Sequence, residues 1–147
     1  EYLTLSRDDF LPVSRVGADG PMHQLRKGGN KPVSLLSYGT ASALRSVVDN
    51  TLRQNIDGPK ILVVNRNALA ISVKAMIMEG FGLGWLPREL CKEELQGVQM
   101  QVVGNDTYIE KLEVRLYRDK DNLKPTLNTL WDDMKLLVEA QTNSASG

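Results

Sequence analysis

Segments with the pattern of a strand alternate with segments with the pattern of a helix along most of this 147-residue chain. Short apolar runs predict strands at 33–38, 60–64, 81–86 and 98–103. Three helices are predicted to follow the first three strands. Apolar residues at helical spacing predict the one at 41–54, apolar residues on most sides predict the one at 68–79, which should be covered on more than one side, and Pro87 with Glu89 in the first turn predicts the one at 87–94. A strand at 112–117 and a helix at 124–139 complete the order. Such alternation is typical of an α/β fold with a mostly parallel sheet, flanked by helices and joined by right-handed crossovers.

The two ends of the chain differ from this middle part. Residues 1–6 and 10–13 are predicted to be two short extended pieces, with Arg7-Asp8-Asp9 as a polar connector between them. Residues 141–147 are polar, and we expect a disordered tail there. The helix at 124–139 carries one apolar stripe, which is formed by Leu127, Leu130, Trp131, Met134, Leu137 and Val138.

The charge and the apolar content exclude several classes of protein. The chain has 18 Lys and Arg against 18 Asp and Glu, and this zero net charge argues against a grip on a nucleic-acid backbone by this segment alone. The longest apolar stretch, 68–78, is too short to span a membrane and is interrupted by Ser72 and Lys74. The single cysteine, Cys91, cannot form an internal disulfide and suits a reducing compartment.

The residues needed for catalysis are sparse. His23 is the only histidine, Cys91 has no histidine near it in sequence, and no group of residues has the spacing of metal ligands. The run Gly80-Phe81-Gly82-Leu83-Gly84 follows a predicted helix and enters a strand, whereas a phosphate-binding fingerprint follows a strand and opens a helix. We therefore expect no enzyme activity and no cofactor, and we interpret Gly82 and Gly84 as positions of close packing between strand and helix.

Two corners between a strand and a helix are candidates for ligand binding. Ser37-Tyr38-Gly39-Thr40 leads into the helix at 41–54, and Asn65-Arg66-Asn67 leads into the helix at 68–79. Ligands of open α/β sheets settle outside the carboxyl ends of the strands, where the starts of helices favour anions and polar groups. The alternative is that Thr40 or Ser42, and Asn67, only cap their helices.

Three segments resemble the effector domain of LysR-type transcriptional regulators, in the order and spacing of that family. The stretch ALAISVKAMIMEGFGLGWLPREL, from residue 68 to 90, has the family's apolar helix, then Gly82, Gly84, Leu86 and Pro87 in the pattern Gly-x-Gly-strand-Leu-Pro. DDFLPVS, at 8–14, is similar to a strand near the start of the second regulatory subdomain. PVSLLSYGTASALRSVVDNTL, at 32–52, is similar to that subdomain's strand and the Ser- or Thr-bearing helix start after it.

The resemblance implies a two-lobed, Rossmann-like regulatory domain with the fold of periplasmic binding proteins. The second subdomain would occupy 7–106, and 107–140 would be the returning strand and helix of the first. The family's N-terminal winged helix-turn-helix and the start of its first subdomain have no counterpart in this sequence. The stripe on the last helix should not stay exposed, so we expect the chain to self-associate or to come from a longer protein.

The resemblance also implies a function and a site. Such regulators bind a small-molecule effector between two subdomains and couple it to the arrangement of a homodimer or homotetramer. They are cytoplasmic, contact no membrane, and bind DNA only through the N-terminal domain. The expected effector-binding residues are Ser37, Gly39, Thr40, Asn65 and Asn67. The helix at 41–54 is the candidate for contacts between protomers, with a polar rim formed by Arg45, Asp49 and Arg53.

Two alternatives from other classes remain at this point. A periplasmic-type solute-binding protein shares the two-lobed architecture, and it would carry an export signal and no DNA-binding region. An α/β enzyme is disfavoured by the lack of a nucleophile with its base or a set of metal ligands.

Overall fold

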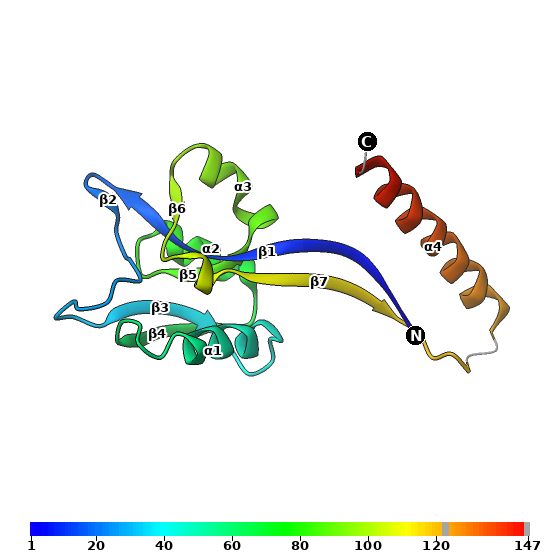
Figure 1. The fold of residues 1–147 in the computed structure, drawn as a ribbon, viewed down its shortest axis with the longest axis horizontal. Helices are drawn as coiled ribbons and strands as arrows, with labels where there is room; N and C mark the ends of the chain where they lie inside the picture. Colours follow the sequence, from blue (N-terminus) through cyan, green and yellow to red (C-terminus); the bar gives the residue numbers. More distant parts are fainter. Residues whose placement is uncertain (122–123, 146–147) are drawn as a thin grey trace. The chain divides into compact units, whose positions relative to one another are not determined.

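A computed structural model describes residues 1–121 and 124–145 (Figure 1). The chain divides into two compact units: a main unit, Asp8–Leu112, and a terminal unit, which combines Glu1–Arg7 with the residues from Glu113 onward. The domain limits predicted at 106 and 140 stay predictions. The elements are β1 (Tyr2–Gly17), β2 (Gly20–Pro21), β3 (Val33–Tyr38), α1 (Leu44–Gln54), β4 (Ile61–Asn67), α2 (Ala70–Met78), β5 (Gly84–Pro87), α3 (Arg88–Gln96), β6 (Met100–Val102), the 3₁₀ turn η1 (Asp106–Tyr108), β7 (Glu110–Tyr117) and α4 (Pro125–Ala145).

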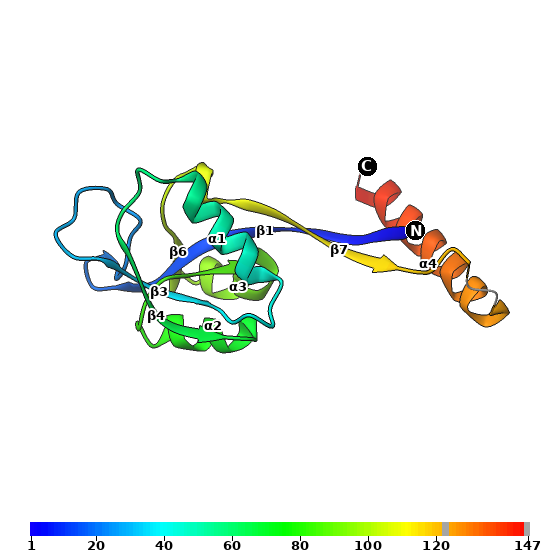
Figure 2. The same cartoon turned by 90° about the horizontal axis from the view of Figure 1, so that it is seen from below.

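The strands and helices from β3 to α4 follow the order predicted from the sequence, and the α/β class is confirmed. The strands form two sheets with both strand directions, and not the mostly parallel sheet that we predicted: one contains β1, β2, β5, β6 and β7, and the other contains β3 and β4. β3 is parallel to β4, and Leu35 forms a parallel bridge to Leu83, just before β5. β1 runs antiparallel to both β5 and β6. Helices α1 and α2 lie on opposite sides of β3 and β4 (Figure 2).

The first strand is one continuous element, and the prediction of two short pieces with a polar connector is wrong. Asp8 and Asp9 lie inside β1 because partners far along the chain satisfy their carboxylates. Asp8 Oδ2 accepts a hydrogen bond from the backbone N–H of Glu89 at 3.2 Å. Asp9 pairs with Lys111 Nζ at 2.5 Å and with Arg88 at 3.4 Å. These contacts tie the start of the main unit to α3 and β7.

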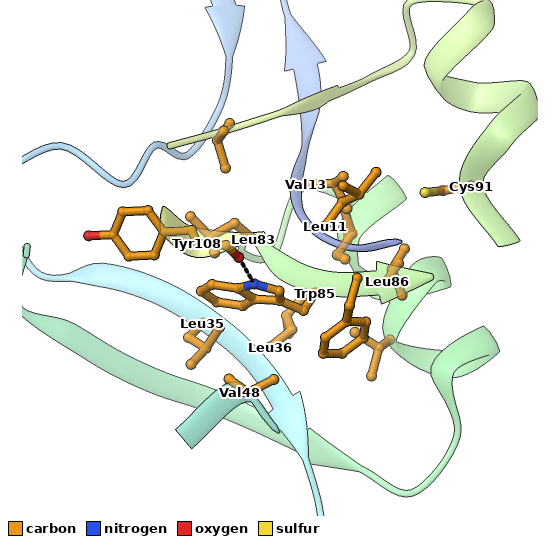
Figure 3. Close-up of a cluster of buried hydrophobic side chains, with 14 of the residues drawn as sticks. Leu11, Val13, Leu35, Leu36, Val48, Leu83, Trp85, Leu86, Cys91 and Tyr108 are labelled. Carbon is orange, nitrogen blue, oxygen red and sulfur yellow. Dashed lines mark hydrogen bonds between the residues drawn. The ribbon is translucent and has the colours of Figure 1, made fainter. Parts of the chain in front are cut away.

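A buried cluster around Trp85 forms the core of the main unit (Figure 3). The indole Nε1 of Trp85 donates to the carbonyl of Tyr108 at 2.8 Å, and its own carbonyl accepts from the hydroxyl of Tyr38 at 2.7 Å. A Cβ added at Gly84 would lie 2.8 Å from the carbonyl oxygen of Leu36, and one at Gly82 would lie 2.7 Å from that of Ser34. The predicted close packing of strand against helix is confirmed at Gly84, which also meets Val73 and Ile77 of α2, whereas Gly82 packs closely against β3 and not against a helix.

The apolar helix α2 is covered on one side only, although its composition predicts cover on more than one side. Val73 and Ile77 are buried against β3 and β5, but Leu69 and Ile71 are 60% and 56% exposed. The neighbouring strand β4 pairs only with β3 within the described chain and exposes Leu62, Val63 and Val64. The main unit therefore presents an apolar surface along β4 and α2.

In the terminal unit, α4 continues to Ala145, so 141–145 do not form the disordered tail that we expected; 146–147 lie outside the described residues. Trp131 is the one buried residue of the predicted stripe, and the guanidinium of Arg118 lies 4.5 Å from its ring centroid. Leu127, Leu130 and Leu137 are exposed. The expectation that another surface covers this stripe stays a prediction.

Candidate functional site

The two predicted corners meet at the carboxyl ends of β3 and β4. In the parallel register, Ser37 lies opposite Arg66, and Tyr38 lies opposite Asn67. The backbone N–H of Gly39, just beyond β3, donates to the carbonyl of Asn67 at 3.0 Å. The structure thus brings Ser37, Gly39 and Asn67 into one corner, which we call the corner site.

Ser37 is the most informative member of the corner site. Its residue is 1% exposed, and its hydroxyl has no hydrogen-bond partner within residues 1–121 and 124–145. A buried polar group without a partner costs about 1–3 kcal/mol. The unpartnered hydroxyl of Ser37 lies near the carboxyl end of β3, ahead of α1, and ligands of α/β proteins bind at such positions.

Thr40 lies between the end of β3 and the start of α1. Thr40 is exposed and its side chain has no hydrogen-bond partner among the residues that the structure describes. It does not cap α1, because the helix begins at Leu44, beyond the start predicted at 41. The Ser42 hydroxyl, our alternative capping group, accepts from the Leu44 N–H at 3.2 Å. The Thr40 hydroxyl is therefore left available to a ligand.

The two asparagines differ in their surroundings. β4 runs to Asn67, so Asn65 lies within the strand, opposite Leu36 and exposed, whereas we expected a polar turn from that residue onward. Asn67 Oδ1 accepts the N–H of Leu69 at 3.1 Å just ahead of α2, which begins at Ala70. The side chain of Asn67 therefore orders the entry to the helix, and Asn65 lies further from the corner than predicted.

Arg66 lies in a corner predicted from the sequence, but it was not among the expected effector-binding residues. Its guanidinium Nη1 donates to the carbonyl of Tyr38 at 3.3 Å, across the end of the two strands. The sequence feature that could have indicated Arg66 is its position between two asparagines at the end of a predicted strand. Only the register of β4 on β3 places it opposite Ser37. A guanidinium here gives the corner a positive charge and donors suited to carboxylates.

A second charged group lies at the carboxyl end of β5. This group is the carboxylate of Asp9, which pairs with Lys111 and with Arg88. The Lys111 ammonium, and to a smaller extent the Arg88 guanidinium, hold the pKa of Asp9 below its usual range. Since Leu83 bridges to β3 in parallel, the end of β5 belongs to the same edge of the sheet as the ends of β3 and β4. This edge therefore combines uncharged polar groups, a free guanidinium face and an ion-paired carboxylate.

Metal ligands and the single thiol are the groups to consider for covalent chemistry. Across the described ranges, no three His, Cys, Asp or Glu side chains are grouped so that they could hold a metal ion. Cys91 is buried, and burial raises the pKa of its thiol to about 11, which makes it a poor nucleophile. The described helices include none with the length and apolar character needed to cross a membrane.

No family model matches the chain. A relative from Escherichia coli O157:H7, described as the HTH domain-truncated transcriptional regulator QseD, is 22% identical over 105 residues, which are 70% of this chain and 42% of that protein. The chain thus spans less than half the length of this curated relative.

Solved structures show the fold. Full-length HypT from Salmonella typhimurium, described as a hypochlorite-specific LysR-type transcriptional regulator, superposes with a TM-score of 0.85 at 21% identity, over 95% of this chain and 47% of that one. Its regulatory domain alone also gives 0.85, at 20% identity, over 95% and 66% of the two chains. LysG from Corynebacterium glutamicum with its bound effector Arg gives 0.60 at 19% identity, over 95% and 46%. The chain has the fold of the regulatory domain of LysR-type transcriptional regulators, and the resemblance stated from the sequence is confirmed.

Proposed function

We propose that this chain is the ligand-sensing part of a bacterial LysR-type transcription factor, and that its effector binds at the corner site. The effector would contact Ser37, Gly39, Thr40 and Asn67, with Asn65 at the margin. The observation that carries this proposal is the buried, unpartnered hydroxyl of Ser37 at the carboxyl end of β3. A bound polar ligand would supply the missing hydrogen bond.

Arg66 favours an effector that carries a carboxylate. Its guanidinium spans the ends of β3 and β4, and no acidic side chain pairs with it within the described residues. LysG, whose structure contains a bound amino-acid effector, supports the same kind of ligand for a domain of this fold. Such a regulator would act in the cytoplasm and reach DNA through a separate N-terminal domain.

Thermal unfolding in the presence of small carboxylates, amino acids and aromatic acids tests the corner site. We expect a hit to raise Tm for the wild-type chain and to lose most of that effect in Ser37→Ala and Arg66→Gln. Ser46→Ala, a serine of similar type on the exposed face of α1, is the matched control and should respond like wild type. The proposal would be wrong if a hit stabilised Ser37→Ala, Arg66→Gln and wild type equally.

We further propose that the effector acts through a homo-oligomer, and that the surface along β4 and α2 contacts the second copy. α1, our first candidate, carries Arg45 and Asp49 as a half-buried i,i+4 ion pair, so its charged side chains already have partners within the helix. α2 instead exposes Leu69 and Ile71. Its one charged side chain, Lys74, is bound to Glu94 of α3 at 2.5 Å. Apart from Arg66 at the end of β4, the described residues of this surface carry no unpaired charge, and an apolar surface of this kind is typical of contacts between protomers.

Sedimentation velocity measures this association directly. We expect Ile71→Glu to raise the dissociation constant of the oligomer at least tenfold, because it places a charge in an apolar contact. Ser46→Glu on α1 is the control and should leave association unchanged. Leu130→Glu reports separately on the exposed stripe of α4, and association lost only in that variant would contradict the proposal for α2.

A further inference from the structure

A groove lies at the amino-terminal end of β4, at the other end of that strand from the corner site. Two neighbouring cavities, of about 380 and 310 Å³, share Asn55, Ile56, Gly58 and Tyr108 as lining residues. We call the pair the Tyr108 groove. The larger cavity is polar and is bordered by Lys27 and Asn105. The smaller one is lined mainly by apolar side chains, those of Leu52, Pro59 and Ile61.

The floor of the Tyr108 groove is held by hydrogen bonds within the main unit. The side chain of Asn55 donates to the carbonyl of Thr107 at 3.2 Å and accepts from the Thr107 hydroxyl at 2.6 Å. A Cβ at Gly58 would lie 2.6 Å from the Tyr108 hydroxyl oxygen, so the turn after α1 packs directly against that hydroxyl. The groove is therefore formed before any ligand binds.

Tyr108 places an unused polar group in this groove. The residue is 6% exposed and its ring packs beside Trp85, with centroids 6.4 Å apart. Figure 3 shows its hydroxyl directed away from the buried cluster. No residue in 1–121 or 124–145 makes a hydrogen bond to that hydroxyl. Burial raises the pKa of Tyr108, so the hydroxyl stays protonated and can donate.

The rim of the groove combines positive charge with exposed apolar surface. Lys27 borders one cavity and Arg53 the other, against a single acidic residue, Asp57. Ile56 stands over both cavities and is 87% exposed, an unusual position for a large aliphatic side chain. A ligand that covered Ile56 and accepted a hydrogen bond from Tyr108 would satisfy both groups at once.

We infer that the Tyr108 groove binds a small carboxylic acid with an apolar ring or chain, at a second site distinct from the corner site. The Tyr108 hydroxyl donates to the carboxylate, and Lys27 and Arg53 supply the positive charge around it. Leu52, Pro59 and Ile61 contact the apolar part. The volumes of the cavities fall at the small end of the range for ligand sites, which sets the size of the acid.

Chemical-shift titration of the ¹⁵N-labelled chain with sodium 3-phenylpropionate tests this inference. We expect saturable shifts at 52–61 and 105–108. Tyr108→Phe keeps the ring and should weaken binding about tenfold, since it removes one hydrogen bond to a charged group. Lys27→Met, at an exposed position, should weaken binding as well. Tyr117→Phe, an exposed tyrosine of the terminal unit, is the control and should bind like wild type.

The outcomes separate this groove from the corner site. Shifts confined to 37–40 and 65–67 would place the acid at the corner site and overturn the inference, and so would an absence of saturable shifts. Equal affinity for 3-phenylpropan-1-ol would show that the carboxylate is not recognised. Unchanged affinity in Tyr108→Phe would remove the hydroxyl from the site, and the spectrum of that variant would confirm that it folds.

Discussion

Replacing Gly84 with alanine tests how closely β5 packs on its neighbours. The new methyl group would lie 2.8 Å from the carbonyl oxygen of Leu36, 3.1 Å from Ile77 Cδ1 and 3.2 Å from Val73 Cγ1. The carbonyl belongs to β3 and cannot move without disturbing the sheet, and both side chains are fully buried. Overpacking of this kind costs about 1–3 kcal/mol. The stiffer unfolded chain offsets about 0.4–1 kcal/mol of this.

We therefore expect Gly84→Ala to lower the free energy of unfolding by about 1–2 kcal/mol. Urea titration measures this loss of stability, and with a slope of about 2 kcal/mol/M the midpoint should fall by roughly 0.5–1 M. In a Trp131→Phe background, Trp85 is the only tryptophan, and because it is buried in the main unit its fluorescence reports the unfolding of that unit. Gly29→Ala is the control, because its methyl group would meet only the Lys31 carbonyl, at 3.8 Å. Equal midpoints for the two variants would refute the packing argument.

Three further predictions concern single residues. Val98 has φ +56° and is 67% exposed, so Val98→Gly should raise the free energy of unfolding by about 0.5–1 kcal/mol in the same titration, since glycine adopts this conformation without strain. Lys111→Met should raise the pKa of Asp9 toward its ordinary value in an NMR titration. In the wild-type chain that pKa is lowered by folding, so the stability that the Asp9–Lys111 pair provides is present above the unfolded pKa of Asp9 and is lost as the pH falls through the folded pKa. Cys91 should resist thiol reagents at pH 8 until urea unfolds the chain, because burial raises the pKa of its thiol to about 11. Since the folded chain favours the protonated thiol, the contribution of Cys91 to the free energy of unfolding is fully present below the unfolded pKa and is lost as the pH rises from 9 toward 11.

The sequence predicted the elements whose apolar content is strong. β3, α1, β4 and α2 lie within three residues of their predicted limits at every end. In β3 and α1 the apolar side chains are buried in the core, whereas β4 and α2 were predicted from continuous apolar runs that the fold leaves partly exposed. β1 was missed as a single strand because Asp8 and Asp9 resemble a solvated connector. Their partners, Arg88 and Lys111, come from distant segments that local patterns cannot reveal.

The candidate site was predictable only in part. Ser37, Gly39 and Asn67 could be placed together because the carboxyl ends of parallel strands share an edge. The contribution of Arg66 depends on the exact register of β4 on β3, and the missing partner of Ser37 depends on burial. The Tyr108 groove gave no local signal, since its floor joins Asn55 to Thr107 across much of the main unit.

The pairing of β1 has a consequence for how the chain is made. Val13 lies opposite Gly84 on one side and Val102 on the other, so this part of β1 lacks both partners until the segment through β6 has left the ribosome. Pairings between such distant segments form slowly, and an unpaired strand with the apolar side chains of Phe10 and Leu11 is prone to aggregation while it waits. Nascent chains that end before residue 102 should therefore depend on chaperones, whereas those that extend past β7, which also pairs with β1, can close the sheet by themselves.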